Sequence, residues 1–557
     1  MKTTIQLLPL ALLALSPILA AQQLPGAGTQ LRQLTPPPLP PPSAPSIRIE
    51  ETTATSTPGM ASAAILVNEL RITGAHAWPE AELLRLTGFV PGSTLTLAQL
   101  HEMANRISAH YRSHGYFVAR ADLPAQQITN HSVTIAVSEG VYDKVTLRNQ
   151  SRLSDAVAGN ILQGLDPGDP ITLAPLEQRL LLLSDLPGVK VNSTLVPGSV
   201  PGTSDLLIDV VPWRRVSGMV YVDNAGHPYT GEWRLGATVN FNNLMGRGDV
   251  ASLQAMTSGS GLVFGRASYQ VPFGRATIGA AYSHLDYQLG KQFELLGANG
   301  TADVASVFGS YALIRSRRSN LTVGAIYEDK RLEDKLGLFP ADGRRANARV
   351  AGLSLHGNRQ DDLGDGGTSS FYVAASSGTL DILTPSARLI DAATARTNGS
   401  YGKLWFNVAR YQRFGDRLAV NASLTGQLAS KNLDPSEKFV LGGMEGVRGY
   451  PQGEAFGDEG YLANVEARLL LGSFSGRVPG DVHLLGFVDA GHVTINRDPW
   501  DNSPNERSLY AAGVGLGWSD PGNFAVRTYY AVPLGSEEAM SAPHKSGRFW
   551  IHAVKYF

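Results

Sequence analysis

The sequence predicts a transmembrane antiparallel β-barrel of about sixteen strands, preceded by two small α+β domains. Three observations support this fold class. From residue 214 onward the chain reads as short alternating strands that no good amphipathic helix interrupts. Glycine is abundant, at 60 of 557 residues, and aromatic residues are plentiful, yet no apolar run beyond the N-terminus is long enough for a membrane helix. Residues 63–213 instead repeat one pattern of helices and strands.

Residues 1–21 have the features of a secretory signal peptide. Met1 and Lys2 give a short positive start, a compact apolar run follows over 7–15, and Ala20 and Ala21 are available for cleavage. A membrane anchor is the alternative, and it would need about 20 apolar residues. We therefore expect an exported protein.

Composition argues against several function classes. The chain has no cysteine, so disulfides and thiolate metal sites are excluded. A net charge of −1 argues against a nucleic-acid partner, whose binding surface would be basic. The histidines are scattered, and no zinc-protease, nucleophile-elbow or P-loop pattern occurs. We expect no enzyme, no catalytic residues, no metal and no cofactor.

The segment before the first repeat divides into two parts. Within residues 22–35, the stretch 29–34 has room for one or two helical turns, which would need a partner surface to be stable. A disordered N-terminus is the alternative. The run from Pro36 to Pro42 is proline except for Leu39, and because proline lacks the N–H donor it should form an extended spacer. We therefore predict a proline-rich linker over 36–62.

Two similar units are predicted over 63–140 and 141–213, each in the order strand, helix, helix, strand, strand. The first has expected strands at 65–72, 116–121 and 132–137 and helices at 79–86 and 97–114; the second has expected strands at 142–147, 189–196 and 205–211 and helices at 154–162 and 173–186. Thr96 and Thr172 are the expected caps of the longer helices. An exposed sheet edge in such a unit can accept a strand from another chain.

The barrel prediction over 214–557 depends on strands with one apolar and one polar face. Residues 233–241 and 461–471 alternate in this way, and in the second segment the polar face includes Asn464, Glu466 and Arg468. A soluble sandwich also alternates, but its sheets leave edges, whereas a barrel in lipid must close. A crossing strand needs about 9–11 residues, and this length suits about sixteen strands, with fourteen and eighteen left open.

Two motifs in the C-terminal half form the candidate site. The first is Val447-Arg448-Gly449-Tyr450, and the second is Phe487-Val488-Asp489-Ala490-Gly491 on a predicted strand. Residues two apart on a strand share a face, so Phe487 and Asp489 would point into the lumen while Val488 faces lipid. Arginine can meet a carboxylate with two parallel hydrogen bonds. A solvated loop arginine and an aspartate without a fixed partner are the alternative.

These motifs and their order resemble a known family. The matching segments are 223–226 with 230–231, 242–249, 269–274, 442–443 with 447–450 and 457–458, and 487–491. Across nearly its whole length the chain resembles the TpsB outer-membrane transporters of two-partner secretion, a branch of the Omp85 superfamily. The two repeats resemble the POTRA (polypeptide-transport-associated) domains of that family.

The resemblance implies a pore in the bacterial outer membrane, with its POTRA domains in the periplasm, that secretes a large β-rich exoprotein of the TpsA type. It implies that the sixth loop folds into the barrel and that Arg448 pairs there with Asp489. Val447, Gly449 and Tyr450 would form the loop tip, and Phe487 and Gly491 would frame the aspartate. Gly449 would permit a backbone turn closed to other residues. The final aromatic residue, Phe557, would be the signal read by the barrel-assembly machinery.

Further expectations concern the partners. The sheet edges at 116–121 and 189–196 would hold the unfolded exoprotein by strand addition. The segment 29–34 would plug the pore at rest, and the barrel wall would contact outer-membrane lipid. A barrel-assembly factor of the same superfamily is the alternative function. Haemolysin, adhesin and contact-dependent toxin remain open as cargo.

Overall fold

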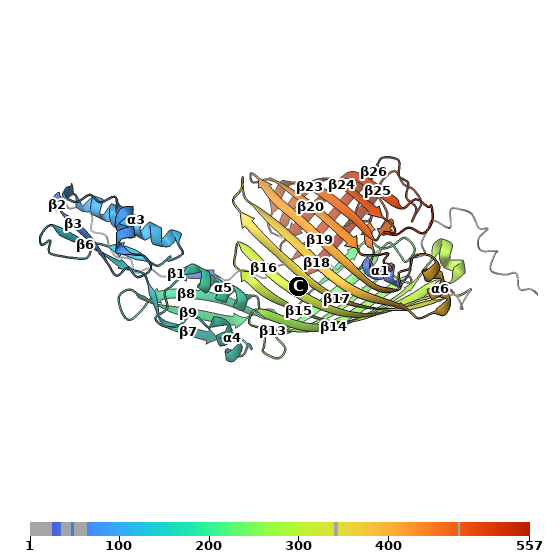
Figure 1. The fold of residues 1–557 in the computed structure, drawn as a ribbon, viewed down its shortest axis with the longest axis horizontal. Helices are drawn as coiled ribbons and strands as arrows, with labels where there is room; N and C mark the ends of the chain where they lie inside the picture. Colours follow the sequence, from blue (N-terminus) through green and yellow to red (C-terminus); the bar gives the residue numbers. More distant parts are fainter. Residues whose placement is uncertain (1–24, 35–45, 50–63, 339–342, 477–478) are drawn as a thin grey trace, which may run out of the picture.

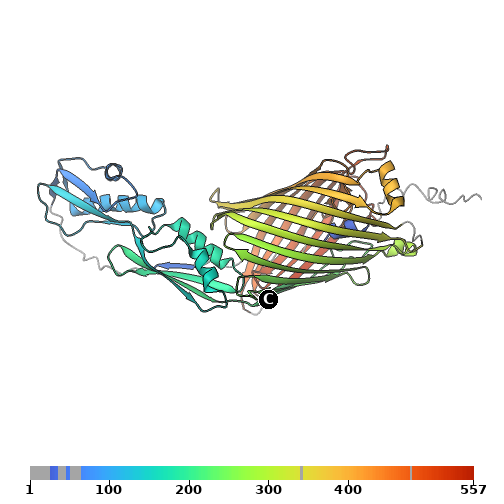
Figure 2. The same ribbon diagram turned by 60° about the horizontal axis from the view of Figure 1, so that its bottom comes forward.

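The structure is a computed structural model that describes residues 25–34, 46–49, 64–338, 343–476 and 479–557. Two small domains and one large barrel lie in a row, with the second small domain next to one mouth of the barrel (Figure 1; Figure 2). The predicted signal peptide lies outside the described residues. Within them, no helix is long and apolar enough to cross a bilayer.

The first small domain packs two helices on a three-stranded sheet. Its elements are β2 (Ile65–Val67), β3 (Glu69–Thr73), α2 (Glu80–Thr87), β4 (Ser93–Leu95), α3 (Leu97–Ser113), β5 (Arg120–Asp122) and β6 (Ser132–Ser138), and the sheet order is β3-β6-β5. Thr96 and Gln99 cap α3 with reciprocal hydrogen bonds. The strand predicted at 116–121 begins later than expected, at Arg120. The residues before it form turns that follow α3, as shown by the hydrogen bond from Tyr116 N to Tyr111 O.

The second small domain has a four-stranded sheet in the order β1-β8-β9-β7. Its elements are β7 (Val141–Asn149), α4 (Asp155–Leu162), α5 (Leu173–Ser184), β8 (Val189–Pro197) and β9 (Thr203–Pro212). Buried leucines of α5, among them Leu176, Leu180 and Leu183, pack on the sheet and form its core.

The fourth strand of that sheet, β1 (Ser46–Ile49), comes from the predicted proline-rich linker. It pairs in parallel with β8, so that Ser46 lies opposite Asn192. The linker is therefore not a spacer over its whole length: its sequence Ser-Ile-Arg-Ile suits a strand, and the edge of β8 provides the missing hydrogen-bond partners. The prediction of a free edge at 189–196 is wrong for the same reason.

The C-terminal part is a closed antiparallel barrel of sixteen strands. The strands are β10 (Val216–Asp223), β11 (Arg234–Asn242), β12 (Val250–Thr257), β13 (Leu262–Phe273), β14 (Ala276–Gln288), β15 (Asn299–Arg315), β16 (Ser319–Lys335), β17 (Arg344–Asp361), β18 (Gly367–Ile382), β19 (Gly399–Phe414), β20 (Leu418–Ala429), β23 (Glu459–Phe474), β24 (Gly480–Thr494), β25 (Glu506–Asp520), β26 (Phe524–Leu534) and β27 (Arg548–Tyr556). The last strand closes the barrel by pairing with the first, Met219 opposite Tyr556. The predicted fold class is confirmed.

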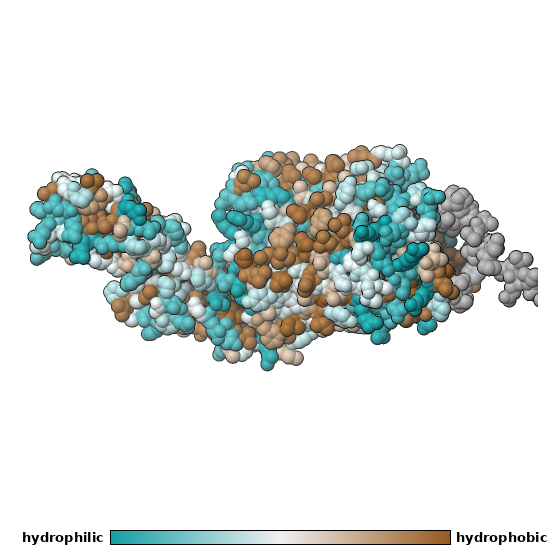
Figure 3. Space-filling model, in the orientation of Figure 1, coloured by the Kyte–Doolittle hydropathy of each residue, from teal (hydrophilic) through white to brown (hydrophobic). Residues whose placement is uncertain are grey.

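Apolar side chains cover the outside of the barrel. Figure 3 shows them gathered across the middle of the wall, with hydrophilic residues nearer the two ends. Leu235 and Val465, from the two segments whose alternation supported the prediction, are about half exposed on this outer surface. Such a band is what a lipid-facing wall requires.

The remaining elements lie inside the barrel or in the connections at the end far from the small domains (Figure 1). They are α1 (Ala27–Arg32), the 3₁₀ helix η2 (Lys291–Leu296), α6 (Pro385–Ala393), β21 (Phe439–Leu441) and β22 (Ala455–Gly457). Helix α1 lies in the lumen against β14, β15 and β16. Strands β21 and β22 pair within the connection between β20 and β23, the sixth connection at that end.

Ion pairs and backbone contacts join the second small domain to the barrel. Arg315, at the end of β15, donates two bonds of 2.7 Å to the carboxylate of Asp185, which follows α5. Arg317 lies 3.0 Å from Glu177 of α5. Ser154 N donates to Gly246 O in the turn between β11 and β12. The domain is thus held at two turns of the barrel.

Candidate functional site

The connection between β20 and β23, residues 430–458, folds back into the barrel. Leu441, Val447 and Tyr450 are buried and pack in one cluster with Leu509 and Ala511 of the wall. The Tyr450 hydroxyl donates to Glu537 O in the last connection, between β26 and β27. We call residues 430–458 the inward loop.

Arg448, at the tip of the inward loop, is bound to Asp489 on β24 by three hydrogen bonds. Its Nε and Nη2 donate to Oδ2 and Oδ1 at 2.9 and 2.8 Å, and its backbone N donates to Oδ2 at 3.0 Å. Asp489 is fully buried, and Asn464 donates a further bond to its Oδ1. The carboxylate is therefore bound by one side chain of the neighbouring strand β23 and by the loop.

A second carboxylate, Glu466 on β23, also binds Arg448. The Nη1 atom of Arg448 donates to Glu466 Oε2 at 2.6 Å, and Arg468 donates to the other oxygen at 2.9 Å. The alternation over 461–471 already places Glu466 on the inward face. The sequence does not show that this face lies opposite Arg448, so Glu466 was not among the predicted site residues.

Aromatic rings complete the surroundings of Arg448. Its guanidinium lies 3.4 Å from the ring centre of Phe487 and 4.9 Å from that of Tyr529. The indole Nε1 of Trp550 donates to the backbone carbonyl of Arg448 at 2.7 Å. Cation–π contacts in a site closed to water stabilise the charge in addition to the carboxylates. Tyr529 and Trp550 lie on the last two strands and carried no motif that would have singled them out.

The two motif glycines make room for close packing. Gly449 does not have a positive φ, so the expected special turn is wrong. A Cβ there would lie 2.9 Å from Ala511 Cβ and from Pro533 N, and this contact is what requires glycine. A Cβ on Gly491 would lie 2.7 Å from Leu441 Cδ2 and 3.2 Å from Val447. Gly491 thus creates the recess for the inward loop.

The base of the inward loop is fixed by other charges. Glu437 accepts a bond of 2.7 Å from Lys330 on β16 and one of 2.6 Å from Lys403 on β19. Lys438 lies 3.0 Å from Asp458, at the far end of the loop. The sequence motifs did not point to these residues.

Helix α1 is bound to both the wall and the inward loop. Ala27 N donates to Asp334 Oδ1 on β16 at 2.7 Å, and Thr230 Oγ1 donates to Gln30 Oε1. Gly28 lies so close to the inward loop that a Cβ would be 2.8 Å from Ser436 N. The helix predicted within residues 22–35 therefore has the partner surface that so short a helix needs.

Phe557, the predicted assembly signal, lies at the end of the barrel seam next to the small domains. Phe557 N donates to Gly218 O at 3.1 Å, and Gly218 N donates to Phe557 O at 3.0 Å. The Phe557 ring covers Gly218, where a Cβ would lie 2.6 Å from its Cζ. Within the described residues, no group of three or more histidine, aspartate or glutamate side chains is arranged to hold a metal ion.

Comparison with known proteins places this geometry in a family. Residues 202–519, more than half of the chain, match the family described as haemolysin secretion/activation protein ShlB/FhaC/HecB, and residues 65–140 match the ShlB-type POTRA domain. The heme/hemopexin transporter protein HuxB of Haemophilus influenzae is 29% identical over 481 residues, 86% of this chain and 84% of that protein. The outer membrane transporter CdiB of Dickeya dadantii is 24% identical over 466 residues, 81% of this chain and 79% of that protein.

Solved structures share the fold. CdiB from Escherichia coli superposes with a TM-score of 0.67 at 20% identity, covering 91% of this chain and 92% of that one. BamA from Haemophilus ducreyi lacking POTRA domains 1–3 superposes with a TM-score of 0.51 at 16% identity, covering 88% and 100%. With the family match, these results confirm the resemblance to TpsB transporters and the outer-membrane location. The chain belongs to the ShlB/FhaC/HecB family, the TpsB outer-membrane transporters of two-partner secretion.

Proposed function

We propose that this chain exports one dedicated partner, a large β-rich exoprotein of the TpsA type that arrives unfolded in the periplasm. A cargo of this class is supported by relatives named heme/hemopexin transporter protein, hemolysin transporter protein and outer membrane transporter CdiB. The observation that carries the proposal is a closed barrel whose lumen holds both helix α1 and the inward loop. A passive pore would need neither, nor the two domains at its entrance.

In this proposal Arg448, Arg468, Glu466 and Asp489, which we call the Arg448 cluster, form the latch that holds the inward loop in the resting state. Arg448 and Arg468 together balance Asp489 and Glu466, so the four charges are neutral as a group. Removing one partner of a buried ion pair costs about 3–5 kcal/mol, because the other charge stays buried without compensation. A cost of this size is large enough to displace the inward loop from its site in the lumen.

The edge of β8 is the cargo-docking strand in this proposal, and β1 occupies it at rest. An incoming extended chain can add to β8 only by displacing β1, which pairs there over four residues. Strand exchange of this kind keeps the backbone hydrogen bonds and makes docking reversible. Because β1 and α1 belong to the same N-terminal segment, displacement of β1 and release of α1 are coupled in this proposal.

The chain has no catalytic role in this proposal. Its other partners are the outer-membrane lipids, which contact the apolar wall, and the barrel-assembly machinery, which would read Phe557 after the last strand. The short seam between β10 and β27 suits such assembly, since closure needs few pairs.

The test is secretion by cells carrying Arg448→Ala. We expect the variant to insert into the outer membrane and to lose export of the partner, because Asp489 and Glu466 are left unpaired. Arg331→Ala is the matched control, since Arg331 lies on β16 with a side chain 76% exposed. Secretion is measured beside a membrane-fraction blot. Normal export by Arg448→Ala would overturn the latch.

A barrel-assembly factor is the second candidate function, because the BamA fold is similar. Deletion of the gene separates the two. A dedicated transporter predicts loss of one secreted protein with normal outer-membrane proteins, whereas an assembly factor predicts a broad deficit of membrane barrels.

A further inference from the structure

A hollow of about 350 Å³ opens in the lumen wall at the end of the barrel that faces the small domains. It lies on the side of the Arg448 cluster that faces the small domains, and Glu466 and Arg468 form part of its lining. The turn between β19 and β20, which carries Arg417, borders it, as does the start of β24. A chain that enters from the periplasmic domains would meet this hollow before it reaches the inward loop.

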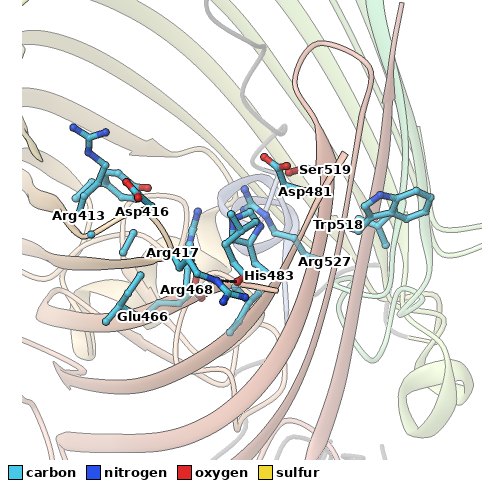
Figure 4. A pocket seen from close by; sticks show the side chains of 18 residues that line it. Arg413, Asp416, Arg417, Glu466, Arg468, Asp481, His483, Trp518, Ser519 and Arg527 are labelled. Carbon is cyan, nitrogen blue, oxygen red and sulfur yellow. Dashed lines mark hydrogen bonds and ion pairs between the residues drawn. The ribbon is translucent and has the colours of Figure 1, made fainter. Parts of the chain in front are cut away.

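Basic side chains converge in the middle of the hollow. Figure 4 shows Arg417, Arg468, His483 and Arg527 directed toward one another from the turn and from three strands. Within the described residues, neither Arg417 nor Arg527 forms an ion pair with a carboxylate; Arg417 donates to backbone carbonyls of Leu470 and Leu471.

The acidic residues around the hollow do not neutralise this group. Glu466 is already bound by Arg448 and Arg468. Asp416 lies at one edge beside Arg413, and Asp481 lies at another edge beside Ser519 (Figure 4). The centre of the hollow therefore keeps unpaired positive charge.

The wall itself provides the space. β25 carries Gly513, Gly515 and Gly517 at alternate positions that face the lumen, and Gly517 lines the hollow. A Cβ on Gly517 would make only ordinary contacts, at 3.7 Å from Leu485 Cδ1 and 4.0 Å from His483 Cβ. A side chain could be placed there without disturbing the wall.

We propose that this hollow is an anion-binding site that takes carboxylate side chains of the secreted chain as it enters the lumen. Arginine binds carboxylates through two parallel, charge-assisted hydrogen bonds. A charged recess with low-dielectric walls also raises the local concentration of oppositely charged groups. The identity of the ligand rests on the proposed function, because only an exported chain would bring carboxylates to this entrance.

The test uses the full chain in a planar bilayer, with hexaglutamate or hexalysine added on the side of the small domains. We expect hexaglutamate to reduce the current and hexalysine to leave it unchanged. Arg417→Gln with Arg527→Gln should weaken the hexaglutamate effect about tenfold, since two exposed charge pairs are lost. Arg331→Gln, which removes an outward-facing charge, should leave the effect unchanged.

A second pair of variants tests the hollow without removing an arginine. Gly517→Glu places a tethered carboxylate in it and should abolish the hexaglutamate effect, whereas Gly517→Gln, of the same size, should retain it. Equal inhibition by hexalysine, an unchanged effect in the double arginine variant, or equal loss in both Gly517 variants would overturn the site.

The two proposals fail in different ways. If hexaglutamate acts as expected but cells with the wild-type protein secrete no partner, the site stands as an anion site and the proposed function fails. If the partner is secreted while hexaglutamate has no effect, the proposed function stands and the site fails.

Discussion

At the scale of single residues, the site combines attraction and close packing. Arg448 is held by two carboxylates, two rings and the indole of Trp550, so its geometry is determined from several sides. Gly449 and Gly491 act differently: each removes a side chain where the loop and the wall touch. Substitution of Arg448 should therefore release the inward loop by leaving buried charges unpaired, whereas substitution of Gly449 or Gly491 should release it by steric overlap.

Gly491→Ala should displace the inward loop without changing any charge. The added methyl group would lie 2.7 Å from Leu441 Cδ2, and overpacking of this kind costs about 1–3 kcal/mol. We expect faster proteolysis of residues 430–458 and higher conductance. Gly486→Ala on the same strand is the control, since a Cβ there meets nothing within 4 Å. Equal protection of both variants would show that Gly491 is not needed for packing.

At the scale of elements, α1 and the inward loop support each other inside the lumen. Helix α1 has only six residues and cannot be stable alone, so its hydrogen bonds to Asp334 and Thr230 and its contact with Ser436 hold it in place. An element held only by tertiary contacts is suited to reversible release.

Deleting residues 22–45 should raise the conductance of the pore in a planar bilayer, because the helix that fills part of the lumen is removed. Gly28→Ala should act in the same direction, since its Cβ would lie 2.8 Å from Ser436 N. Gly265→Ala, on β13 with open space at the Cβ position, is the matched control. Unchanged conductance after the deletion would argue against a plug.

The pairing of β1 with β8 predicts competition with cargo. Ile47→Pro with Ile49→Pro removes backbone donors and prevents β1 from pairing. We expect tighter binding of an N-terminal cargo fragment, measured by fluorescence anisotropy, because the edge of β8 is then free. Ile47→Thr with Ile49→Thr keeps the strand propensity and serves as control. Weaker binding in the proline variant would instead make β1 part of the docking site.

At the scale of the whole molecule, the small domains are fixed to the barrel by charge. The bidentate pair of Arg315 with Asp185 and the pair of Arg317 with Glu177 set the direction in which the second domain points. Partly exposed ion pairs are weak and depend on salt, so this joint can open at a small energetic cost.

Arg315→Gln with Arg317→Gln should loosen the joint between barrel and periplasmic domains. Distances between spin labels on α5 and on β18 should broaden in pulsed electron resonance, and the wild type should approach this behaviour at high salt. Arg318→Gln is the control, because Arg318 in the same turn pairs with Asp362 of the barrel rather than with the domain. Identical distance distributions would show that the backbone contacts alone hold the joint.

The sequence by itself determined the barrel class, the repeated domains and the candidate motifs. Each of these depends on local pattern: alternation over 233–241 and 461–471, a repeated order of elements, and short motifs around Arg448 and Asp489. Alternation with a period of two identifies which residues share a face regardless of which strands become neighbours. That is why Val488 and Glu466 could be placed outward and inward from the sequence.

Only the tertiary structure decided which distant faces meet. The binding of Glu466 to Arg448, the pairing of β1 with β8, and the hold of Lys330 and Lys403 on Glu437 join segments far apart in the chain. The role of Gly449 also changed, since closeness to Ala511 and Pro533, not its own backbone angle, requires glycine. Closing the barrel and folding a loop into it create these contacts, and no local pattern encodes them.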